Sequence, residues 1–543
     1  MSVVAADPTP GSPTVEVDVA DCVAAPSLRA RLTPPMPRGG WFGWLGPIAV
    51  TLLAAVLRLN DLGRPVAVVF DETYYVKDAL SLLLFGYERQ AVEGADKQLL
   101  ASNGDPSSLT GLFTDQASFV VHPPVGKWVI ATGEQLFGVT PFGWRIGTAV
   151  LSILSVLLVA RITRRLTRSN LFGTLAGLLV AIDGLSIVMG RTALLDISLM
   201  FFVLVAFGCL LIDRDRSRRR MAKLLDDQPI TPGVMLSGRL AKLGPGLGLR
   251  PWRIAAGVSL GLACGVKWSG LYYVVAFGLL TVLWDVGARR AAGVARPWRA
   301  VLLRDALPAF ASIVGSALVV YIATWSGWLL SSGGWDRNWA AGVGTDYPFI
   351  PEALRSLWHY HVEAWNFHTN LTTPHSYSAN PWGWPLQARP TSFFYESPTG
   401  VCGTDKCAQE VLALGNPIIW WTGVVALIHQ AWRWVGRRDW RAGAVLCGFL
   451  AGWLPWLFFQ ERTVFSFYSI VFEPFIVMAV ALTLGSILGP AKAAGNRRIY
   501  GAMGIGTILI AAVAVAWIFY PLWTAGPIPH ADWALRMWFP TWV

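Results

Sequence analysis

The stretch FGWRIGTAVLSILSVLLVARITRRLTR, residues 142–168, decides the fold class of this chain. It opens with an apolar run of the length, about 20 residues, that an α-helix needs to cross the hydrocarbon of a bilayer. The run then passes into a cluster of arginines, which is typical of the cytoplasmic end of a membrane span. The pattern predicts a transmembrane helix that starts at the outer surface, near Arg145, and ends inside.

The same alternation of apolar runs and arginine clusters fills the rest of the chain. Hydrophobic residues make up 54% of the 543 residues, only 14% are charged, and the mean hydropathy is +0.48. An ordinary soluble domain carries about 25% charged residues, so this composition excludes a disordered chain and argues against a soluble enzyme. The short alternating segments of a transmembrane β-barrel are absent. We predict an all-α polytopic membrane protein with about eleven spans, at roughly 43–59, 142–161, 170–189, 193–212, 252–267, 269–286, 304–324, 412–431, 441–459, 464–488 and 499–520.

The distribution of Lys and Arg orients these spans. With the N-terminus inside, the N-terminal tail and the five cytoplasmic connections hold 29 of the 44 Lys and Arg residues, as the positive-inside rule requires. An odd number of spans then places the C-terminus outside. The net charge of +11 therefore faces anionic lipid headgroups, and no nucleic-acid partner is needed to explain it.

Four regions follow from this topology. Residues 1–40 are expected to be a disordered cytoplasmic tail, and residues 41–325 to hold spans one to seven with a first outer loop at 60–141. A large outer loop occupies 326–411, and residues 412–543 hold spans eight to eleven and an outer C-terminal tail. Both outer loops are long and rich in aromatic residues. Long loops in a compact protein are usually functional or disordered, and the aromatic content argues against disorder.

Each outer loop contains one predicted helix. In the second loop, EALRSLWHYHVEAWNFH (352–368) spaces its apolar residues at helical intervals, and we expect an amphipathic helix on the outer leaflet. In the first loop, VGKWVIATGEQLF (125–137) is apolar but too short to span a membrane. We expect the second loop to cover a functional site as a partly helical lid.

The sequence FDETYY (70–75) places two adjacent carboxylates, Asp71 and Glu72, between aromatic residues just after the first span. One interpretation is structural: Asp71 caps a helix, and Glu72 lies in its first turn. The other is functional, since a carboxylate at the boundary between water and lipid can act as a general base. The sequence around these two residues leaves both interpretations open.

Further ionisable residues fall, by topology, at the same outer boundary of the membrane. Each has a structural alternative, such as a rigid Pro-Pro turn, an internal ion pair or a side chain that reaches for the interface. Cations at this depth nevertheless suit a lipid phosphate better than they suit hydrocarbon. The candidates are His122, Lys127, Arg145, Arg191, Asp196, Lys267 and Arg462.

Five motifs in this order resemble the protein O-mannosyltransferases, which are multi-spanning enzymes of the GT-C fold class. They are FDETYY (70–75), HPPVGKW (122–128), RTALLD (191–196), GVKWSGLYY (265–273) and GNPIIWW (415–421). The resemblance covers the chain from about the first span to the last. The chain departs from eukaryotic members in one respect, because its large outer loop is too short to hold their β-trefoil MIR domain. It is thus similar to bacterial, actinobacterial-type members.

The resemblance implies a polyprenyl-phosphate mannose donor and Ser or Thr acceptors on secreted or membrane proteins, met during Sec export. It implies a multi-pass plasma-membrane enzyme whose site faces the extracytoplasmic side. A hydroxyl acceptor needs a base, and a phosphate leaving group needs cations. We therefore predict Asp71 as the base, with Glu72 orienting the acceptor or a cation. Arg145 and Arg462, with Lys267, are predicted to bind the donor phosphate, and His122, Lys127, Arg191 and Asp196 are further site candidates.

No metal site is predicted with these roles, and metal dependence stays open. Asp213-Arg214-Asp215 has the form of a nucleotide-sugar metal motif, but its place in a cytoplasmic Arg cluster favours salt bridges. Four histidines in the large outer loop favour aromatic packing over a zinc site. Cys402 and Cys407 lie close enough in sequence for a local disulfide, which the sequence leaves open.

Two alternative functions also stay open. A GT-C transferase could glycosylate a lipid or a cell-wall glycan instead of a protein. A membrane transporter is the non-enzymatic alternative, and Asp183 is the buried acid that it would use. Against transport, the ionisable residues gather at one membrane face rather than at the midplane.

Overall fold

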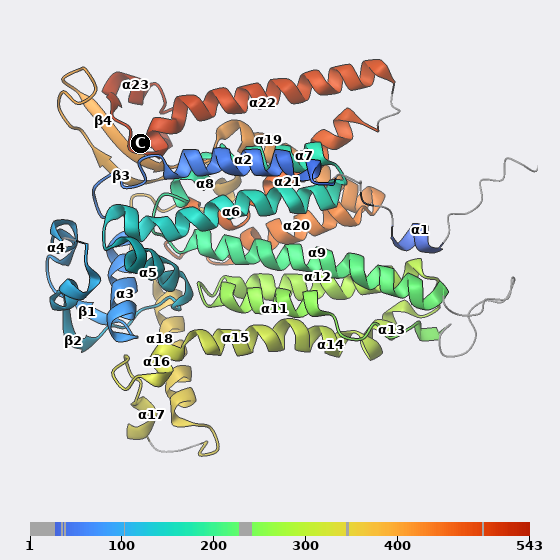
Figure 1. The fold of residues 1–543 in the computed structure, drawn as a ribbon, viewed down its shortest axis with the longest axis horizontal. Helices are drawn as coiled ribbons and strands as arrows, with labels where there is room; N and C mark the ends of the chain where they lie inside the picture. Colours follow the sequence, from blue (N-terminus) through green and yellow to red (C-terminus); the bar gives the residue numbers. More distant parts are fainter. Residues whose placement is uncertain are drawn as a thin grey trace, which may run out of the picture.

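The computed structural model describes residues 28–33, 36, 40–102, 104–226, 242–343, 347–490 and 494–543. These residues form a bundle of helices that run roughly along one axis, with smaller elements gathered at its two ends (Figure 1). Seven of the described helices are long and apolar enough to cross a membrane. The bundle consists of α2 (Phe42–Leu59), α6 (Pro141–Thr167), α7 (Asn170–Ala181), α8 (Gly184–Met189), α9 (Asp196–Asp226), α11 (Pro251–Cys264), α12 (Gly270–Ala291), α14 (Ala306–Phe310), η3 (Ala311–Gly315), α15 (Ser316–Thr324), α19 (Pro417–Arg437), α20 (Trp440–Trp453), α21 (Glu473–Leu488) and α22 (Gly495–Trp523).

Every predicted span contains a helix, but several predicted boundaries differ from those of the helices: the predicted span at 464–488, for example, holds α21 only from Glu473 on. The segment at 170–189 is two helices, α7 and α8, because the side chain of Asp183 caps α8 by accepting hydrogen bonds from the backbone N–H groups of Leu185 and Ser186. The predicted span at 412–431 starts later, at α19, because its first residues belong to a strand.

Two small sheets accompany the helices, and both lie at the same end of the bundle. β1 (Arg89–Ala91) pairs antiparallel with β2 (Phe113–Ala117). β4 (Cys407–Ala413) lies between β3 (Thr391–Glu396) and β5 (Ile528–Pro529). Cys402 and Cys407 form a disulfide at the tip of the β3–β4 hairpin. This end also carries α3 (Glu72–Phe85), α4 (Ala95–Ala101), η2 (Pro106–Leu112), α5 (Val125–Phe137), α16 (Ser326–Leu330), α17 (Trp339–Gly342), α18 (Glu352–Asn370), η4 (Pro381–Leu386), η5 (Leu454–Phe458), η6 (Ser466–Val471), α23 (His530–Ala534) and η7 (Pro540–Trp542).

The two helices predicted in the outer loops are confirmed as α5 and α18. Glycines let α5 lie very close to α6: a Cβ on Gly133 would come within 2.2 Å of the backbone oxygen of Gly143. The first outer loop is thereby fastened to the bundle, and it positions α3 above the ends of the spans (Figure 1).

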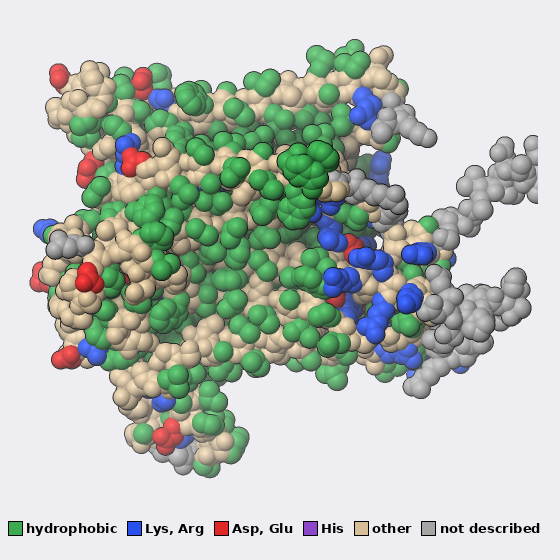
Figure 2. Space-filling model, viewed as in Figure 1, with side chains coloured by type: hydrophobic (Ala, Val, Ile, Leu, Met, Phe, Trp, Pro, Cys, Tyr) green, Lys and Arg blue, Asp and Glu red, His purple; other side chains and the backbone are tan. Residues whose placement is uncertain are grey.

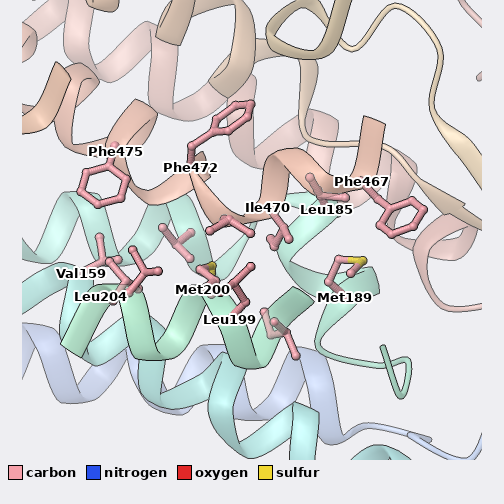
Figure 3. Packing of buried hydrophobic residues seen from close by; sticks show 14 of the residues in the cluster. Val159, Leu185, Met189, Leu199, Met200, Leu204, Phe467, Ile470, Phe472 and Phe475 are labelled. Atoms are coloured by element: carbon pink, nitrogen blue, oxygen red, sulfur yellow. The ribbon is translucent and has the colours of Figure 1, made fainter. Parts of the chain in front are cut away.

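The core of the bundle is apolar and centred on α9 and α21. Figure 3 shows Met200 and Leu204 of α9 facing Phe472 and Phe475, with Val159 of α6 beside them. Ten consecutive residues of α21, 473–482, are buried. Because protein interiors are close-packed, such a core holds the ends of its helices in fixed register, and the site described below depends on those ends.

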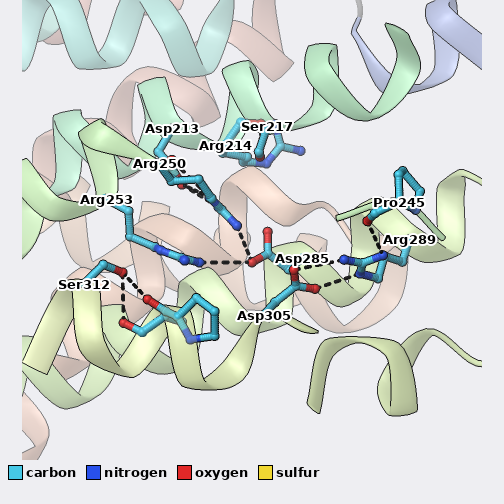
Figure 4. A network of polar contacts seen from close by, with 12 residues as sticks. Asp213, Arg214, Ser217, Pro245, Arg250, Arg253, Asp285, Arg289, Asp305 and Ser312 are labelled. Carbon is cyan, nitrogen blue, oxygen red and sulfur yellow. Dashed lines mark hydrogen bonds and ion pairs between the residues drawn. The ribbon is translucent and has the colours of Figure 1, made fainter. Parts of the chain in front are cut away.

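The opposite end of the bundle is basic. Figure 2 shows Lys and Arg side chains gathered there, whereas Asp and Glu lie mainly at the end with the sheets. Asp213 accepts hydrogen bonds from the Nε of Arg250 at 3.0 and 3.1 Å, and the same guanidinium reaches Asp285 (Figure 4). The predicted salt bridges of the Asp213-Arg214-Asp215 motif are therefore confirmed.

Two short helices complete the basic end, α1 (Leu28–Leu32) and α13 (Pro297–Arg304). α1 lies within the region 1–40 that we expected to be a disordered tail, and it packs against α9. Leu32 is buried there against Met221 and Leu225. The prediction for residues 1–27 falls outside the described residues.

Candidate active site

Asp71 directly precedes α3 and occupies its N-cap position. The residue before it, Phe70, has a φ of +47°, which is a strained conformation for a bulky side chain. Aromatic rings hold it there: the Phe70 ring stacks on Phe393 of β3 at 4.8 Å and meets Phe465 and Phe467 edge-on at 5.6 Å. The large outer loop and η6 thus fix the backbone that aims the Asp71 carboxylate.

The surroundings of Asp71 raise the pKa of its carboxyl group. Its side chain is partly buried, and the hydroxyl of Tyr75 donates toward its Oδ2 at 3.5 Å. Burial raises the pKa of Asp71 to about 6, with the charge of Lys267 opposing the rise and that of Asp196 adding to it. A carboxylate with this pKa is mostly ionised at neutral pH yet binds a proton more readily than an ordinary Asp, as a general base requires.

A cavity opens at the same end of the bundle, with an empty volume of about 1050 Å³ including its mouth. Two cations line it, Lys267 and Arg462. The Lys267 ammonium lies 2.7 Å from the carboxylate of Asp196 and 5.0 Å from the centre of the Tyr468 ring. Asp71 is not itself a lining residue, but it lies close enough to Lys267 and Asp196 for their charges to shift its pKa.

Arg462 is held in the cavity by the last turn of α18. Its Nε donates to the backbone oxygen of His368 at 3.0 Å, and one terminal nitrogen lies 3.2 Å from the Nδ1 of the same residue. Burial and the nearby cations lower the pKa of His368 to about 4 and that of His122 well below 6.5. Both histidines are therefore neutral at pH 7, and Lys267 and Arg462 supply the positive charge of the cavity.

Glu72 and Arg145 form a buried ion pair and do not line the cavity. Two nitrogens of Arg145 donate hydrogen bonds to the carboxylate of Glu72, at 2.8 and 2.9 Å. Its remaining N–H groups donate to the backbone oxygens of Leu62, Pro65 and Ala67. All five of its N–H groups are used inside the protein, so none is left for a donor phosphate. The predicted phosphate role of Arg145 does not fit this structure.

Glu72 accepts two further hydrogen bonds, from the backbone N–H groups of Val69 at 3.0 Å and Ala193 at 2.9 Å. It therefore ties the start of α3 to the turn before α9. Its contact with Arg145 fits the predicted task of orienting a cation, whereas its four hydrogen bonds leave no oxygen free for an acceptor.

Three further candidates separate into one that lines the cavity and two that do not. Asp196 lines it as the partner of Lys267. Lys127 is buried in a separate ion-pair group with Glu88 and Asp78. Arg191 donates to the backbone oxygens of Arg58, Asn60 and Asp61, so it caps the end of α2. Lys127 and Arg191 therefore stabilise the structure around the cavity and do not line it.

Four residues that were not among the predicted site residues also line the cavity: Trp268, Tyr272, His368 and Tyr468. Two of them belong to the GVKWSGLYY motif, whose aromatic residues were a usable signal. His368 and Tyr468 come from segments far apart in the chain, and only the fold brings them together. In the part of the chain that the structure describes, no group of three or more His, Cys, Asp and Glu side chains could hold a metal ion.

An apolar groove adjoins the cavity of Lys267 and Arg462 and shares Trp268, Leu271 and Trp365 with it. α11, α12, α15 and α18 form its walls, with Val274 and Leu318 among the lining residues. Its empty volume is about 1330 Å³, including its mouth. A ligand with an anionic head and a long apolar tail would match a cationic cavity that continues into an apolar groove.

Two family profiles match the sequence. One, described as dolichyl-phosphate-mannose-protein mannosyltransferase, matches residues 48–225, and the other, described as the C-terminal four-transmembrane region of protein-O-mannosyltransferase, matches residues 353–542. A polyprenol-phosphate-mannose–protein mannosyltransferase of Mycolicibacterium smegmatis is 40% identical over 514 residues, covering 92% of this chain and 93% of the relative. The protein of the same description from Corynebacterium glutamicum is 32% identical over 507 residues, covering 91% and 92%.

The fold matches a solved member of the same group. The Saccharomyces cerevisiae protein O-mannosyltransferase Pmt1–Pmt2 complex, solved with its sugar donor, superposes with a TM-score of 0.67 at 14% identity, covering 95% of this chain and 94% of that one. The predicted GT-C class is thereby confirmed. Because both halves of the chain match the family profiles and relatives at 32–40% identity match it over nine-tenths of its length, this chain belongs to the protein O-mannosyltransferase family.

Proposed function

We propose that this protein transfers mannose from polyprenyl-phosphate mannose to Ser and Thr hydroxyls of exported proteins, at the outer face of the plasma membrane. The observation that carries the proposal is the position of Asp71, a carboxylate with a raised pKa beside a cavity that holds Lys267 and Arg462. Such a site pairs a base for an attacking hydroxyl with cations for a phosphate leaving group.

The reaction needs few groups. Asp71 removes the proton from the acceptor hydroxyl while the hydroxyl oxygen forms a bond to the anomeric carbon. The bond from that carbon to the phosphate oxygen breaks, and its electron pair leaves with the polyprenyl phosphate. Lys267 and Arg462 stabilise the charge on the phosphate. A single displacement inverts the anomeric centre and does not require the second carboxylate of a glycosidase.

The apolar groove beside Trp268 and Trp365 supports a lipid-linked donor. A polyprenyl chain lying in it would leave its phosphate at the cationic cavity, because the two spaces share residues. The acceptor would approach from the side of Asp71, where the outer loops form the surface. We propose that these acceptors are met during Sec export, before they fold.

Replacing Arg462 by Ala is expected to weaken donor binding by about tenfold or more, because a charge-assisted contact to the phosphate is lost. Lysine should restore only part of this affinity, since it lacks the planar fork of Arg. Binding of polyprenyl-phosphate mannose to the purified protein measures the effect. Arg389→Ala is the matched control, because this arginine also bonds backbone oxygens at the same end of the molecule and does not line the cavity. Unchanged donor affinity in Arg462→Ala would remove this residue from the phosphate site.

Single introduced cysteines test the proposed orientation in the membrane. Asp115 and Arg290 are exposed at opposite ends of the bundle. In a Cys22→Ser background, Asp115→Cys should react with a membrane-impermeant thiol reagent on whole cells, and Arg290→Cys should react only after the cells are opened. The reverse pattern would place the cavity on the cytoplasmic side.

The direct test of the activity is mannose transfer to a peptide. Membranes that contain the protein are incubated with radiolabelled polyprenyl-phosphate mannose and a Ser/Thr-rich peptide, and the products are separated. We expect label on the peptide, released by treatments that cleave O-linked sugars. Label that appears only in lipid or in cell-wall glycan would favour the other GT-C activity and would contradict the proposal.

A further inference from the structure

A second cavity lies at the basic end of the bundle, away from the site described above. Its empty volume is about 2080 Å³, including its open mouth. Three arginines at the end of α6 line it, together with Arg214, Arg219 and Lys223 of α9 and Arg29 of α1. Nothing in the mannosyl transfer reaction uses this cavity.

The charges in this cavity are unbalanced. Asp215 is the one acidic residue among the described residues that line it, and both Arg165 and Arg214 contact its carboxylate. Arg168 and Lys223 form no ion pair with any other described residue. The positive-inside rule explains why cations lie at this end of the spans, but a flank of solvated cations does not require that they line one concave space.

One buried polar group in the cavity lacks a partner. Arg214 is 8% exposed, and its Nε makes no hydrogen bond within the described part of the chain. Its guanidinium is held 3.3 Å above the ring of Trp440. A buried N–H that is left without an acceptor is costly, and an anion in the cavity would satisfy it.

The cavity is also partly apolar. Leu32 and Met36 line it from the N-terminal side and Trp440 from the start of α20. It lies where the spanning helices end, which is the depth of lipid headgroups. Basic pockets between helices at this depth are suited to phosphate headgroups with their acyl chains alongside.

We propose that this cavity binds the phosphate headgroup of an anionic phospholipid. Cationic side chains from α6 and α9 contact the phosphate, and the apolar residues contact the first part of the acyl chains. Because α1 supplies Arg29 and Leu32, the bound lipid also joins α1 to the ends of α6 and α9.

Native mass spectrometry of the purified full chain tests this proposal, with phosphatidylglycerol as the probe and phosphatidylcholine as the zwitterionic comparison. We expect phosphatidylglycerol to bind at least about tenfold more tightly. The double variant Arg168→Gln/Lys223→Gln should lose about tenfold or more in affinity for it, because two cations near the lipid phosphate are removed. The variant Arg290→Gln/Arg299→Gln removes the same charge from exposed positions at the same end and should bind as the wild type does.

Three results would overturn the proposal. They are equal binding of the two lipids, an unchanged affinity in Arg168→Gln/Lys223→Gln, and full displacement of the lipid by millimolar inorganic phosphate, which would indicate a site for soluble phosphate. Mannosyl transfer by the variants reports that they are folded, because these residues lie far from the active site. Should Arg168→Gln/Lys223→Gln fail to fold, Arg29→Gln/Lys223→Gln replaces it, since both of its side chains are exposed.

Discussion

Replacing Asp71 by Asn should lower the rate of mannosyl transfer at least about a hundredfold, which is the lower range for loss of a positioned general base. Asparagine keeps the shape of the side chain and can still receive the weak contact from Tyr75. Donor affinity should therefore stay within about twofold of the wild type. Single-turnover transfer with saturating donor measures the chemical step apart from binding.

Asp115→Asn is the control for this experiment, because Asp115 is exposed in the same outer loop. It should transfer mannose at the wild-type rate. If Asp71→Asn retained near-normal transfer while its donor affinity also stayed normal, Asp71 would not be the base, and the proposed chemistry would need another group.

Replacing Arg145 by Leu should lower the free energy of unfolding by about 3–5 kcal/mol, because it leaves the carboxylate of Glu72 buried without its partner. Both side chains of this pair are fully buried. The exposed pair of Arg64 and Asp61 provides the contrast, since a surface ion pair contributes about 0–1 kcal/mol. Thermal unfolding in detergent should show a much lower midpoint for Arg145→Leu than for Arg64→Leu.

This experiment also separates the two roles considered for Arg145. If Arg145→Leu unfolds at the wild-type temperature but binds the donor weakly, the arginine contacts the donor phosphate as its sequence position suggested. If it unfolds early and the folded fraction binds the donor normally, Arg145 stabilises the fold, as its five internal hydrogen bonds indicate.

The helices of the bundle could be predicted from the sequence because each helix is indicated by residues that lie close together in the chain. Each apolar run with an arginine cluster at one end predicts one helix, and the helical spacing in 125–137 and 352–368 predicts α5 and α18. These predictions use only residues within a few turns of each other. The strands at the end of the bundle that carries the sheets were missed because they are short, and because one of their pairings joins distant segments: β5 lies over a hundred residues after β4.

The residues of the site also fall into two groups: those indicated by their neighbours in sequence, and those whose contacts join distant parts of the chain. Asp71 was predicted from its neighbours and from the resemblance, and the structure gives it a raised pKa beside Lys267. The partner of Arg145 could not be predicted, because Glu72 lies 73 residues away. Asp183 is similar: it accepts hydrogen bonds from Asn416 and Trp420, more than 230 residues further along. These contacts give it a structural task in place of the transport role considered for it.

The pH dependence of kcat/KM for mannosyl transfer tests the assignment of Asp71 most directly, because this parameter reports the ionisation of the unliganded enzyme. Asp71 must be ionised to accept a proton, and burial raises its pKa to about 6. The rate should therefore be level above about pH 7 and fall about tenfold per pH unit below 6. The cavity histidines do not interfere, because the pKa of His368 is about 4 and that of His122 lies well below 6.5.

The titration of Asp78 could also produce a fall in rate at acid pH. Burial raises the pKa of Asp78 to about 7, although the charge of Lys127 opposes this rise. It lies outside the cavity, so Asp78→Asn should leave the acid limb of the profile near pH 6. A profile that is level down to pH 5, or an acid limb that disappears in Asp78→Asn, would contradict the assignment of Asp71 as the catalytic base.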